Sequence, residues 1–200
     1  MTRKPVYAVA VVVFIAATAM TITSILLPSW ISYRVFTPGG SLTKTIGLHR
    51  SCYTVDGTTK CHSFPQDDDC HTSDRYFCSI WRSVGFMMSF TAVVELVTLV
   101  AYMVIIGGGR AKREGGWKIL AFLLFLVGML QCAAMSLVAY LYDNDDRFFI
   151  GWELGNAWIL CTISWSIAIL SSVFLSLSAY VFPSEGGYEL IPSERYGRPF

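Results

Sequence analysis

Charged residues are scarce in this sequence. Only 14% of its 200 residues are Asp, Glu, Lys or Arg, whereas a soluble domain carries about 25%. Catalytic patterns are missing as well, because the chain has no Walker phosphate loop, no His-Glu-x-x-His and no Ser-His-Asp arrangement. No Asn-x-Ser/Thr sequon occurs, so we expect no N-linked glycan. These absences argue against a soluble chain and against an enzyme, and they give no reason to expect a cofactor.

Long apolar runs take the place of charge. Hydrophobic residues make up 54% of the chain and are concentrated in four runs, 5–27, 81–106, 117–142 and 156–182. Each run is at least as long as the roughly 20 residues that a helix needs to cross a bilayer. The first run is too long to be the core of a cleaved signal peptide. The sequence therefore predicts four spanning helices surrounded by membrane lipid, and a net charge of +1 gives no reason to expect a nucleic-acid partner.

Lys and Arg gather in three segments that we expect to lie in the cytosol, where the loops of membrane proteins are rich in these residues. They are Arg3 and Lys4 before the first run, Arg110, Lys112 and Arg113 in the link between the second and third runs with Lys118 at its end, and Arg195 and Arg198 in the tail. The other two segments, 28–80 and 143–155, are acidic on balance and are predicted to lie outside. Both termini would then be cytosolic, and the polar tail 183–200 is predicted to be disordered.

A β-hairpin whose two strands are joined by a disulfide is predicted within the first outer segment. Asp56-Gly57 is a strong signal for a two-residue turn, because such a turn needs positive φ at both central positions. Counting outwards from the turn places Cys52 opposite Cys61, with Cα atoms about 4.5 Å apart, and predicts a disulfide. Cys70 and Cys78 would form a second one on the same oxidising side. Two alternatives remain open, free thiols or a metal site that includes the histidines after Cys61 and Cys70.

Further strands are predicted on both sides of a turn at residues 38–40. Residues 31–35 and 42–48 alternate apolar and polar side chains, as half-buried strands do. With the hairpin they give a small antiparallel sheet, which we expect a strand from the second outer segment to complete. Residues 64–77 are expected to be irregular, with a short helix near their end. Trp30 follows the first span and is expected in the headgroup region, which indole rings favour.

Two polar side chains lie near the middle of the predicted spans. Glu95 is about fourteen residues into the second span, and Gln131 is at a similar depth in the third. A carboxyl group in hydrocarbon faces the interior of the bundle. We expect a neutral Glu95 that donates a hydrogen bond to the Gln131 carbonyl, and the alternative is a functional acid on an ion or proton path.

The fourth span has a small residue at every fourth position. These residues are Ser164, Ala168, Ser172 and Ser176. Such a ladder lets a neighbouring helix approach closely, which predicts helix packing on this face. The alternative is chance in a serine-rich helix.

The chain resembles a divergent claudin-like member of the peripheral myelin protein, epithelial membrane protein and claudin superfamily. The resemblance rests on Trp30, Gly47-Leu48, Cys52, Cys61, Arg82 and the stretch from Trp152 to Trp158, which includes Glu153 and Gly155. The chain departs from the family pattern at His49, which stands where the family has Trp after Gly-Leu. It also departs in having Cys70 and Cys78, and in its C-terminal sequence Gly197-Arg198-Pro199-Phe200.

The resemblance implies a fold and a function. The fold is a membrane all-α four-helix bundle with a small extracellular antiparallel β-sheet. The function is non-enzymatic, in the plasma membrane, and consists of lateral and cell-contact assembly through the disulfide-clamped sheet. Partners would be further copies of the chain or other membrane proteins. The alternative is an auxiliary subunit that modulates a channel or transporter.

One short motif in the tail predicts a sorting signal. Tyr188 is followed three positions later by the bulky apolar Ile191, which is the pattern of a tyrosine-based internalisation motif.

Overall fold

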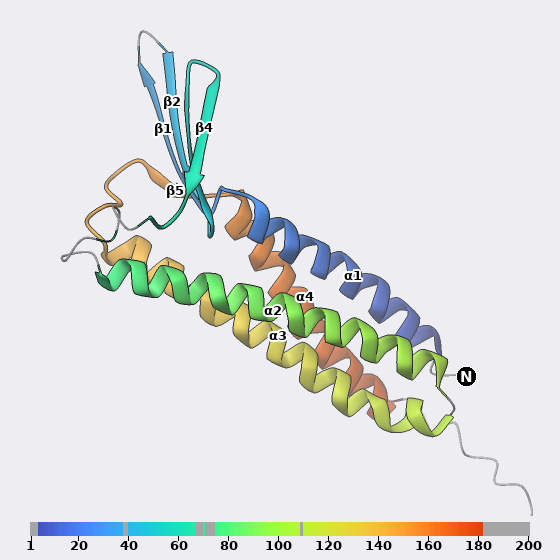
Figure 1. Cartoon of the computed structure of the whole chain (residues 1–200). Helices are drawn as coiled ribbons and strands as arrows, with labels where there is room; N and C mark the ends of the chain where they lie inside the picture. The colour runs from blue at the N-terminus through green and yellow to red at the C-terminus, as the bar shows by residue number, and fades with distance from the viewer. Residues whose placement is uncertain (1–3, 38–39, 67–69, 71–74, 109, 182–200) are drawn as a thin grey trace, which may run out of the picture.

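Four long helices lie side by side in the computed structural model of the chain, which describes residues 4–37, 40–66, 70, 75–108 and 110–181 (Figure 1). They are α1 (Lys4–Leu26), α2 (Arg75–Gly107), α3 (Arg110–Asn144) and α4 (Asn156–Val181). Each is long and apolar enough to cross a membrane. The tail beyond residue 181, with Tyr188 and Ile191, lies outside the described residues.

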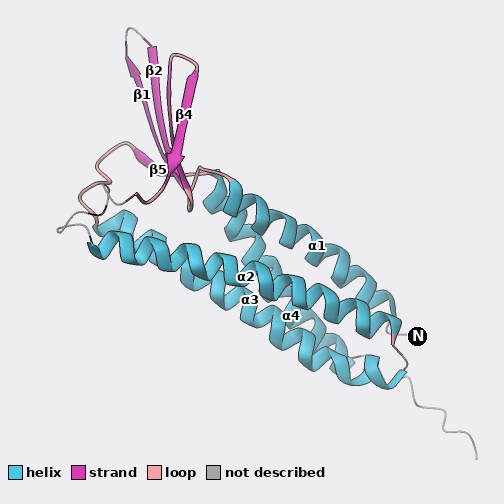
Figure 2. Cartoon of the chain, in the orientation of Figure 1, coloured by secondary structure: helices cyan, strands magenta, loops and turns pink. Residues whose placement is uncertain are grey.

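A five-stranded antiparallel sheet extends from one end of the bundle (Figure 2). Its strands are β1 (Ile31–Thr37), β2 (Gly40–Ile46), β3 (Arg50–Val55), β4 (Thr58–Ser63) and β5 (Trp152–Leu154). Their order is β4-β3-β2-β1-β5, so the strand from the second loop pairs with β1, which follows α1. The expected bundle with a small antiparallel sheet is therefore confirmed in its architecture.

The β3–β4 hairpin has the predicted register. Val55 pairs with Thr58, and the count continues outwards to Cys52 opposite Cys61. Asp56 and Gly57 both have positive φ, at 49° and 80°, as a two-residue hairpin turn requires. The turn therefore determines which residues face each other along the whole hairpin.

Two helices extend further than the apolar runs that predicted them. α2 begins at Arg75, so the short helix expected near residue 77 and the second span are one continuous helix. α3 begins at Arg110, which makes most of the predicted basic link helical. Hydropathy marks the part of a helix that lies in the membrane, whereas Lys, Arg and Glu extend a helix into water at little cost.

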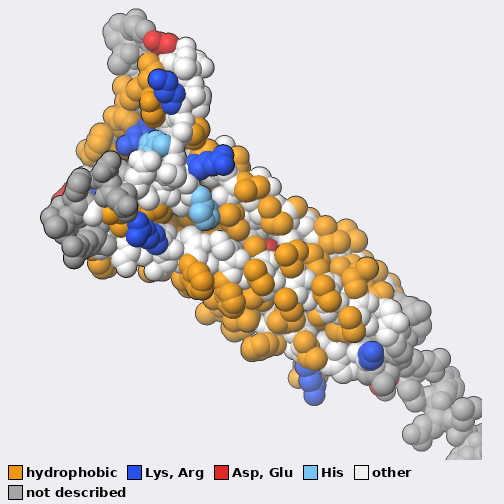
Figure 3. Space-filling view, in the orientation of Figure 1, with side chains coloured by type: hydrophobic (Ala, Val, Ile, Leu, Met, Phe, Trp, Pro, Cys, Tyr) orange, Lys and Arg blue, Asp and Glu red, His pale blue; other side chains and the backbone are white. Residues whose placement is uncertain are grey.

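Buried side chains form separate clusters along the bundle. The cluster at the sheet end contains Trp30, Trp81, Met88, Val138 and Leu141, and the one at the opposite end contains Tyr7, Phe14, Tyr102, Leu120 and Leu175. Apolar side chains also cover the outside of the helices, as the orange surface in Figure 3 shows. A surface of this kind suits contact with hydrocarbon rather than water.

The small-residue ladder of α4 packs against two neighbouring helices. Ser164, Ala168 and Ser172 are buried, and Ser176 is partly buried. The Ser164 hydroxyl donates to the Ala17 carbonyl of α1 at 3.0 Å, and the Ser172 hydroxyl donates to the Ala121 carbonyl of α3 at 2.8 Å. These bonds require close approach of the backbones, so the packing interpretation of the ladder is confirmed for these two positions.

Candidate functional site

Trp30 fastens the sheet to the bundle. Its backbone N–H donates to the Ile46 carbonyl of β2 at 2.9 Å, and its carbonyl accepts from the Gly155 N–H, just before α4, at 2.8 Å. Its indole Nε1 donates to the Ser24 carbonyl of α1 at 2.8 Å. The side chain is fully buried, so the expectation that it lies among lipid headgroups is wrong. The indole N–H is hydrogen-bonded to a backbone carbonyl inside the protein instead.

Two glycines make room for this attachment. A Cβ atom at Gly155 would collide with the Ser29 carbonyl oxygen, and a Cβ atom at Gly47 would lie 2.5 Å from Pro28 Cα. Both obstacles are backbone atoms of the segment between α1 and β1, so no side chain can move aside. Leu48, which follows Gly47, is buried in the same cluster as Trp30. Four motif residues, Trp30, Gly47, Leu48 and Gly155, thus meet at the joint between sheet and bundle.

Gly155→Ala is expected to destabilise the protein by about 3 kcal/mol, the upper part of the range for overpacking, because the collision is with backbone. Thermal unfolding of the purified chain in detergent measures the effect. Gly115→Ala is the matched control, because a Cβ atom at Gly115 meets nothing within 4 Å. Equal melting temperatures for the two variants would show that the joint tolerates a shift of its backbone.

Aromatic side chains fill the space between the sheet and the helix ends. Trp81 of α2 stacks with Phe77 at 5.5 Å between ring centroids, and the Trp152 ring of β5 lies 5.5 Å from Phe148. The Arg147 guanidinium lies over the Phe77 ring at 4.5 Å, a cation–π contact. The Tyr142 hydroxyl at the end of α3 donates to the Trp152 carbonyl at 2.7 Å. These contacts fix the sheet at one orientation relative to the helices.

Two disulfides connect the predicted cysteine pairs. Cys52 and Cys61 are joined across the β3–β4 hairpin with Cα atoms 4.1 Å apart, and Cys70 is joined to Cys78 in the first turn of α2. The described residues contain no group of three or more His, Cys, Asp or Glu side chains that would hold a metal ion. Cys61 and Cys70 of the cysteine–histidine metal alternative are in these disulfides, and His71, which that alternative also needs, lies outside the described residues.

The remaining two motif residues lie apart from the joint. Arg82 is exposed on the second turn of α2, and Glu153 is exposed on β5 opposite Ser32. The motif is thus divided between the buried joint, the Cys52–Cys61 disulfide and two surface positions rather than gathered in one site.

The β1 edge is open over its outer half. β5 pairs with β1 only at Ile31, Ser32 and Tyr33, and the continuation of β1 to Phe36 has no strand partner on that side among the described residues. Phe36 is 78% exposed and Ile150 is fully exposed. Phe149 packs against Tyr33 at 5.3 Å between ring centroids while remaining largely exposed. We call Phe36, Phe149, Ile150 and the open part of β1 the β1-edge patch.

The opposite edge has a different character. The strand β4 carries Thr, Lys, Cys, His and Ser side chains, nearly all exposed, and no large apolar residue. Polar and charged edge strands resist pairing with other chains. Phe149 and Ile150 were not predicted as a surface site, although the three consecutive apolar residues Phe148-Phe149-Ile150 in an acidic loop are a signal visible in the sequence.

A second candidate site lies in the middle of the bundle and takes one side chain from each helix. Thr21, Glu95, Gln131 and Ser164 are all fully buried. Thr21 Oγ1 donates to Glu95 Oε1 at 2.8 Å, and Gln131 Nε2 donates to both Glu95 Oε1 and Thr21 Oγ1, at 2.9 and 2.8 Å. The hydroxyls of Thr21 and Ser164 are 2.7 Å apart. We call these four residues the buried polar cluster.

The expected pairing of Glu95 with Gln131 is present, but the donor is different. The Gln131 amide donates to Glu95, whereas a bond from Glu95 to the Gln131 carbonyl had been expected. Glu95 Oε2 and Gln131 Oε1 have no hydrogen-bond partner among the described residues. Thr21 and Ser164 were not predicted as partners, because Thr and Ser are frequent in these helices and their contacts depend on how each helix is rotated.

Neither the family models nor the curated proteins compared with this chain match it. The fold and the geometry of these sites therefore define its class as a multi-pass membrane protein with four candidate spanning helices and a disulfide-bonded sheet.

Proposed function

We propose that this chain is a non-enzymatic plasma-membrane protein that assembles laterally and at cell contacts through its sheet. The claudin-like resemblance and the β1-edge patch support this proposal. In the proposed orientation both termini are cytosolic and the sheet is extracellular. Lys112 and Lys118 support it, because the start of α3 is at the end of the bundle opposite the sheet, and basic residues favour the cytosolic side.

The observation that carries the proposal is the open edge of β1 with exposed apolar residues beside it. An edge strand presents unpaired N–H and C=O groups that another chain can extend by adding a strand. Exposed Phe36 and Ile150 would lose contact with water in such a pairing, which favours association by about 25 cal/mol per Å² of apolar surface buried. The rigid joint supports the proposal further, because it holds the edge at one angle to the membrane in every copy.

The test changes the two edges separately. Phe36→Lys together with Ile150→Lys places charge on the β1-edge patch, and Lys on an edge strand opposes pairing. Thr59→Lys places one lysine on the β4 edge and is the control for adding charge to an edge strand. Each tagged protein is expressed in cells that lack it, and two quantities are measured: the native mass after gentle solubilisation, and enrichment at contacts between two expressing cells.

We expect self-multimers and contact enrichment for the wild type and for Thr59→Lys, and neither for the double variant. A wild-type complex with one stoichiometric foreign membrane protein would instead support the auxiliary-subunit alternative. A wild-type monomer evenly spread over the cell surface would contradict both functions.

A further inference from the structure

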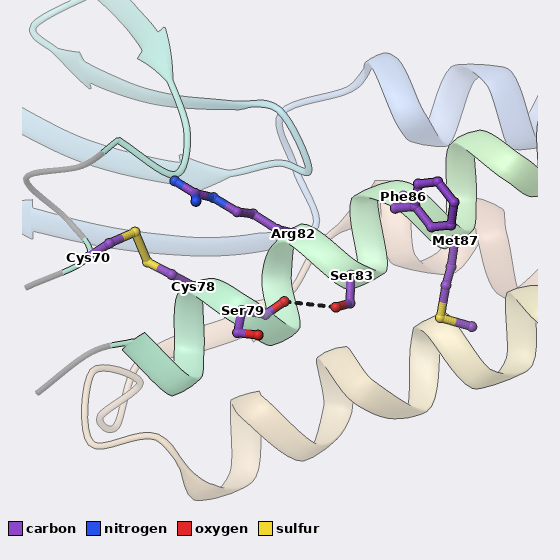
Figure 4. Close-up of a pocket in the computed structure, with 7 residues that line it drawn as sticks. All are labelled: Cys70, Cys78, Ser79, Arg82, Ser83, Phe86 and Met87. Carbon is purple, nitrogen blue, oxygen red and sulfur yellow. Dashed lines mark hydrogen bonds between the residues drawn. A yellow bond between two sulfur atoms is a disulfide. The ribbon is translucent and has the colours of Figure 1, made fainter. Parts of the chain in front are cut away.

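An open cavity of about 690 Å³ lies beside the outer surface of α2 at the sheet end of the bundle. Figure 4 shows its lining, with the Cys70–Cys78 disulfide on one side, Ser79, Arg82 and Ser83 on two successive helical turns, and Phe86 and Met87 further along the helix. The cavity is thus polar and cationic toward the sheet and apolar toward the middle of the bundle. A ligand that fits it must have both characters.

The apolar part continues down the same face of α2. Phe86, Phe90, Val93, Val97, Val100 and Val104 are all exposed and follow one another at steps of three or four residues. The Phe86 and Phe90 rings lie nearly parallel, 6.3 Å apart. A face with this spacing points in one direction from the helix, and here it points away from the buried interior of the bundle.

The length of this face matches a bilayer. Phe86 and Val104 are eighteen residues apart, which corresponds to about 27 Å along a helix that rises 1.5 Å per residue. The hydrocarbon core of a bilayer is about 30 Å thick. Arg82 is one turn beyond Phe86, about 6 Å further toward the sheet. Its guanidinium group is therefore at the height of the phospholipid phosphates when the apolar face lies within the hydrocarbon.

We propose that this cavity binds one glycerophospholipid, with its phosphate against Arg82 and an acyl chain along Phe86 and Phe90. A guanidinium carries five N–H donors in a planar fork that matches phosphate oxygens. The exposed Ser79 hydroxyl lines the same cavity and supplies a second donor. The Ser83 hydroxyl does not, because it donates to the Ser79 carbonyl at 2.9 Å.

The proposal is tested with the purified full-length chain in non-ionic detergent. Dioleoylphosphatidylglycerol is titrated in, and native mass spectrometry measures the affinity of the first bound lipid. Arg82→Gln is expected to weaken that affinity at least about tenfold, because it replaces a charge-assisted bond to phosphate. Arg82→Lys should lose less. Arg34→Gln is the matched control, because Arg34 is exposed on β1 and does not line this cavity.

Two further probes identify the ligand chemistry. Dioleoylglycerol has the chains without the phosphate, and glycerol 3-phosphate has the phosphate without the chains, so both are expected to bind at least about tenfold more weakly than the phospholipid. Equal binding of dioleoylglycerol would show that apolar contact alone holds the lipid. Equal binding of glycerol 3-phosphate would show a free-phosphate site. Either result overturns the proposal.

The folding of each variant is checked separately from its lipid affinity. Non-reducing peptide mapping establishes whether each variant retains both disulfides. If Arg82→Gln does not fold, Ser79→Asp replaces it, since a carboxylate at this exposed position repels phosphate and is expected to weaken binding to a similar extent. Unchanged lipid affinity in a folded Arg82→Gln or Ser79→Asp variant, or an equal loss in Arg34→Gln, contradicts the site.

Discussion

Cys52→Ser is expected to cost about 3 kcal/mol of folding stability and to retain the protein in the secretory pathway. The Cys52–Cys61 disulfide spans nine positions of sequence, and closing a loop of that size lowers the entropy of the unfolded chain by an amount equivalent to about 3 kcal/mol. Cys52 is also buried in the sheet, so an unpaired hydroxyl there adds a desolvation cost. Surface labelling and thermal unfolding of the purified chain measure the two consequences.

The comparison variants separate the disulfide from other effects. Cys61→Ser removes the same bond. The variant that carries both Cys52→Ser and Cys61→Ser should therefore match the stability of Cys52→Ser to within about a few tenths of a kcal/mol. Cys132→Ala is the control, because Cys132 is a free cysteine in α3. Non-reducing peptide mapping that finds Cys52 linked to Cys70, or unlinked, would refute the pairing.

Local rules explain why the hairpin was predictable from sequence. A two-residue turn sets its own register, and the alternation of the strands then carries that register outwards to Cys52 and Cys61. The four spans were predictable for a similar reason, since a run of about 20 apolar residues has few other stable environments. In both cases the signal is contained within one continuous segment.

Features that depend on several segments at once were not predictable in the same way. The burial of Trp30 requires the ends of β2 and α1 and the start of α4 to meet around it, and no pattern near residue 30 contains that information. The open edge of β1 depends on the three-residue length of β5. The strand was expected, but the point where its pairing stops is set by the turn around Gly151, whose φ is 110°.

The buried polar cluster was predictable from the sequence only in part. Depth along two helices was enough to pair Glu95 with Gln131, because each residue advances a helix by a fixed rise. Depth alone does not give the rotation of a helix about its axis. That rotation decides that Thr21 and Ser164 also face the centre, and that one Glu95 oxygen accepts from two donors while the other has none among the described residues.

Glu95→Leu is expected to destabilise the bundle by about 1–3 kcal/mol. It removes the two hydrogen bonds that Glu95 Oε1 accepts from Thr21 and Gln131, and bonds between membrane helices are worth about 0.6–1.7 kcal/mol each. Glu95→Gln keeps a carbonyl oxygen for both donors and should preserve stability. Thr98→Val is the matched control, because the buried Thr98 hydroxyl donates within its own helix to the Val94 carbonyl. Thermal unfolding in detergent compares the variants.

Glu95→Gln also separates a structural role of Glu95 from a role that needs its negative charge. The substitution keeps the shape and acceptor of Glu95 and supplies a donor in place of the unpartnered Oε2, as a neutral acid would. Native mass and contact enrichment should therefore equal those of the wild type if Glu95 serves only to join the helices. Loss of assembly in a folded Glu95→Gln variant would mean that the carboxylate itself is needed. The cluster would then be better explained as part of an ion or proton path, because a neutral isostere would hold all four helices together and still fail.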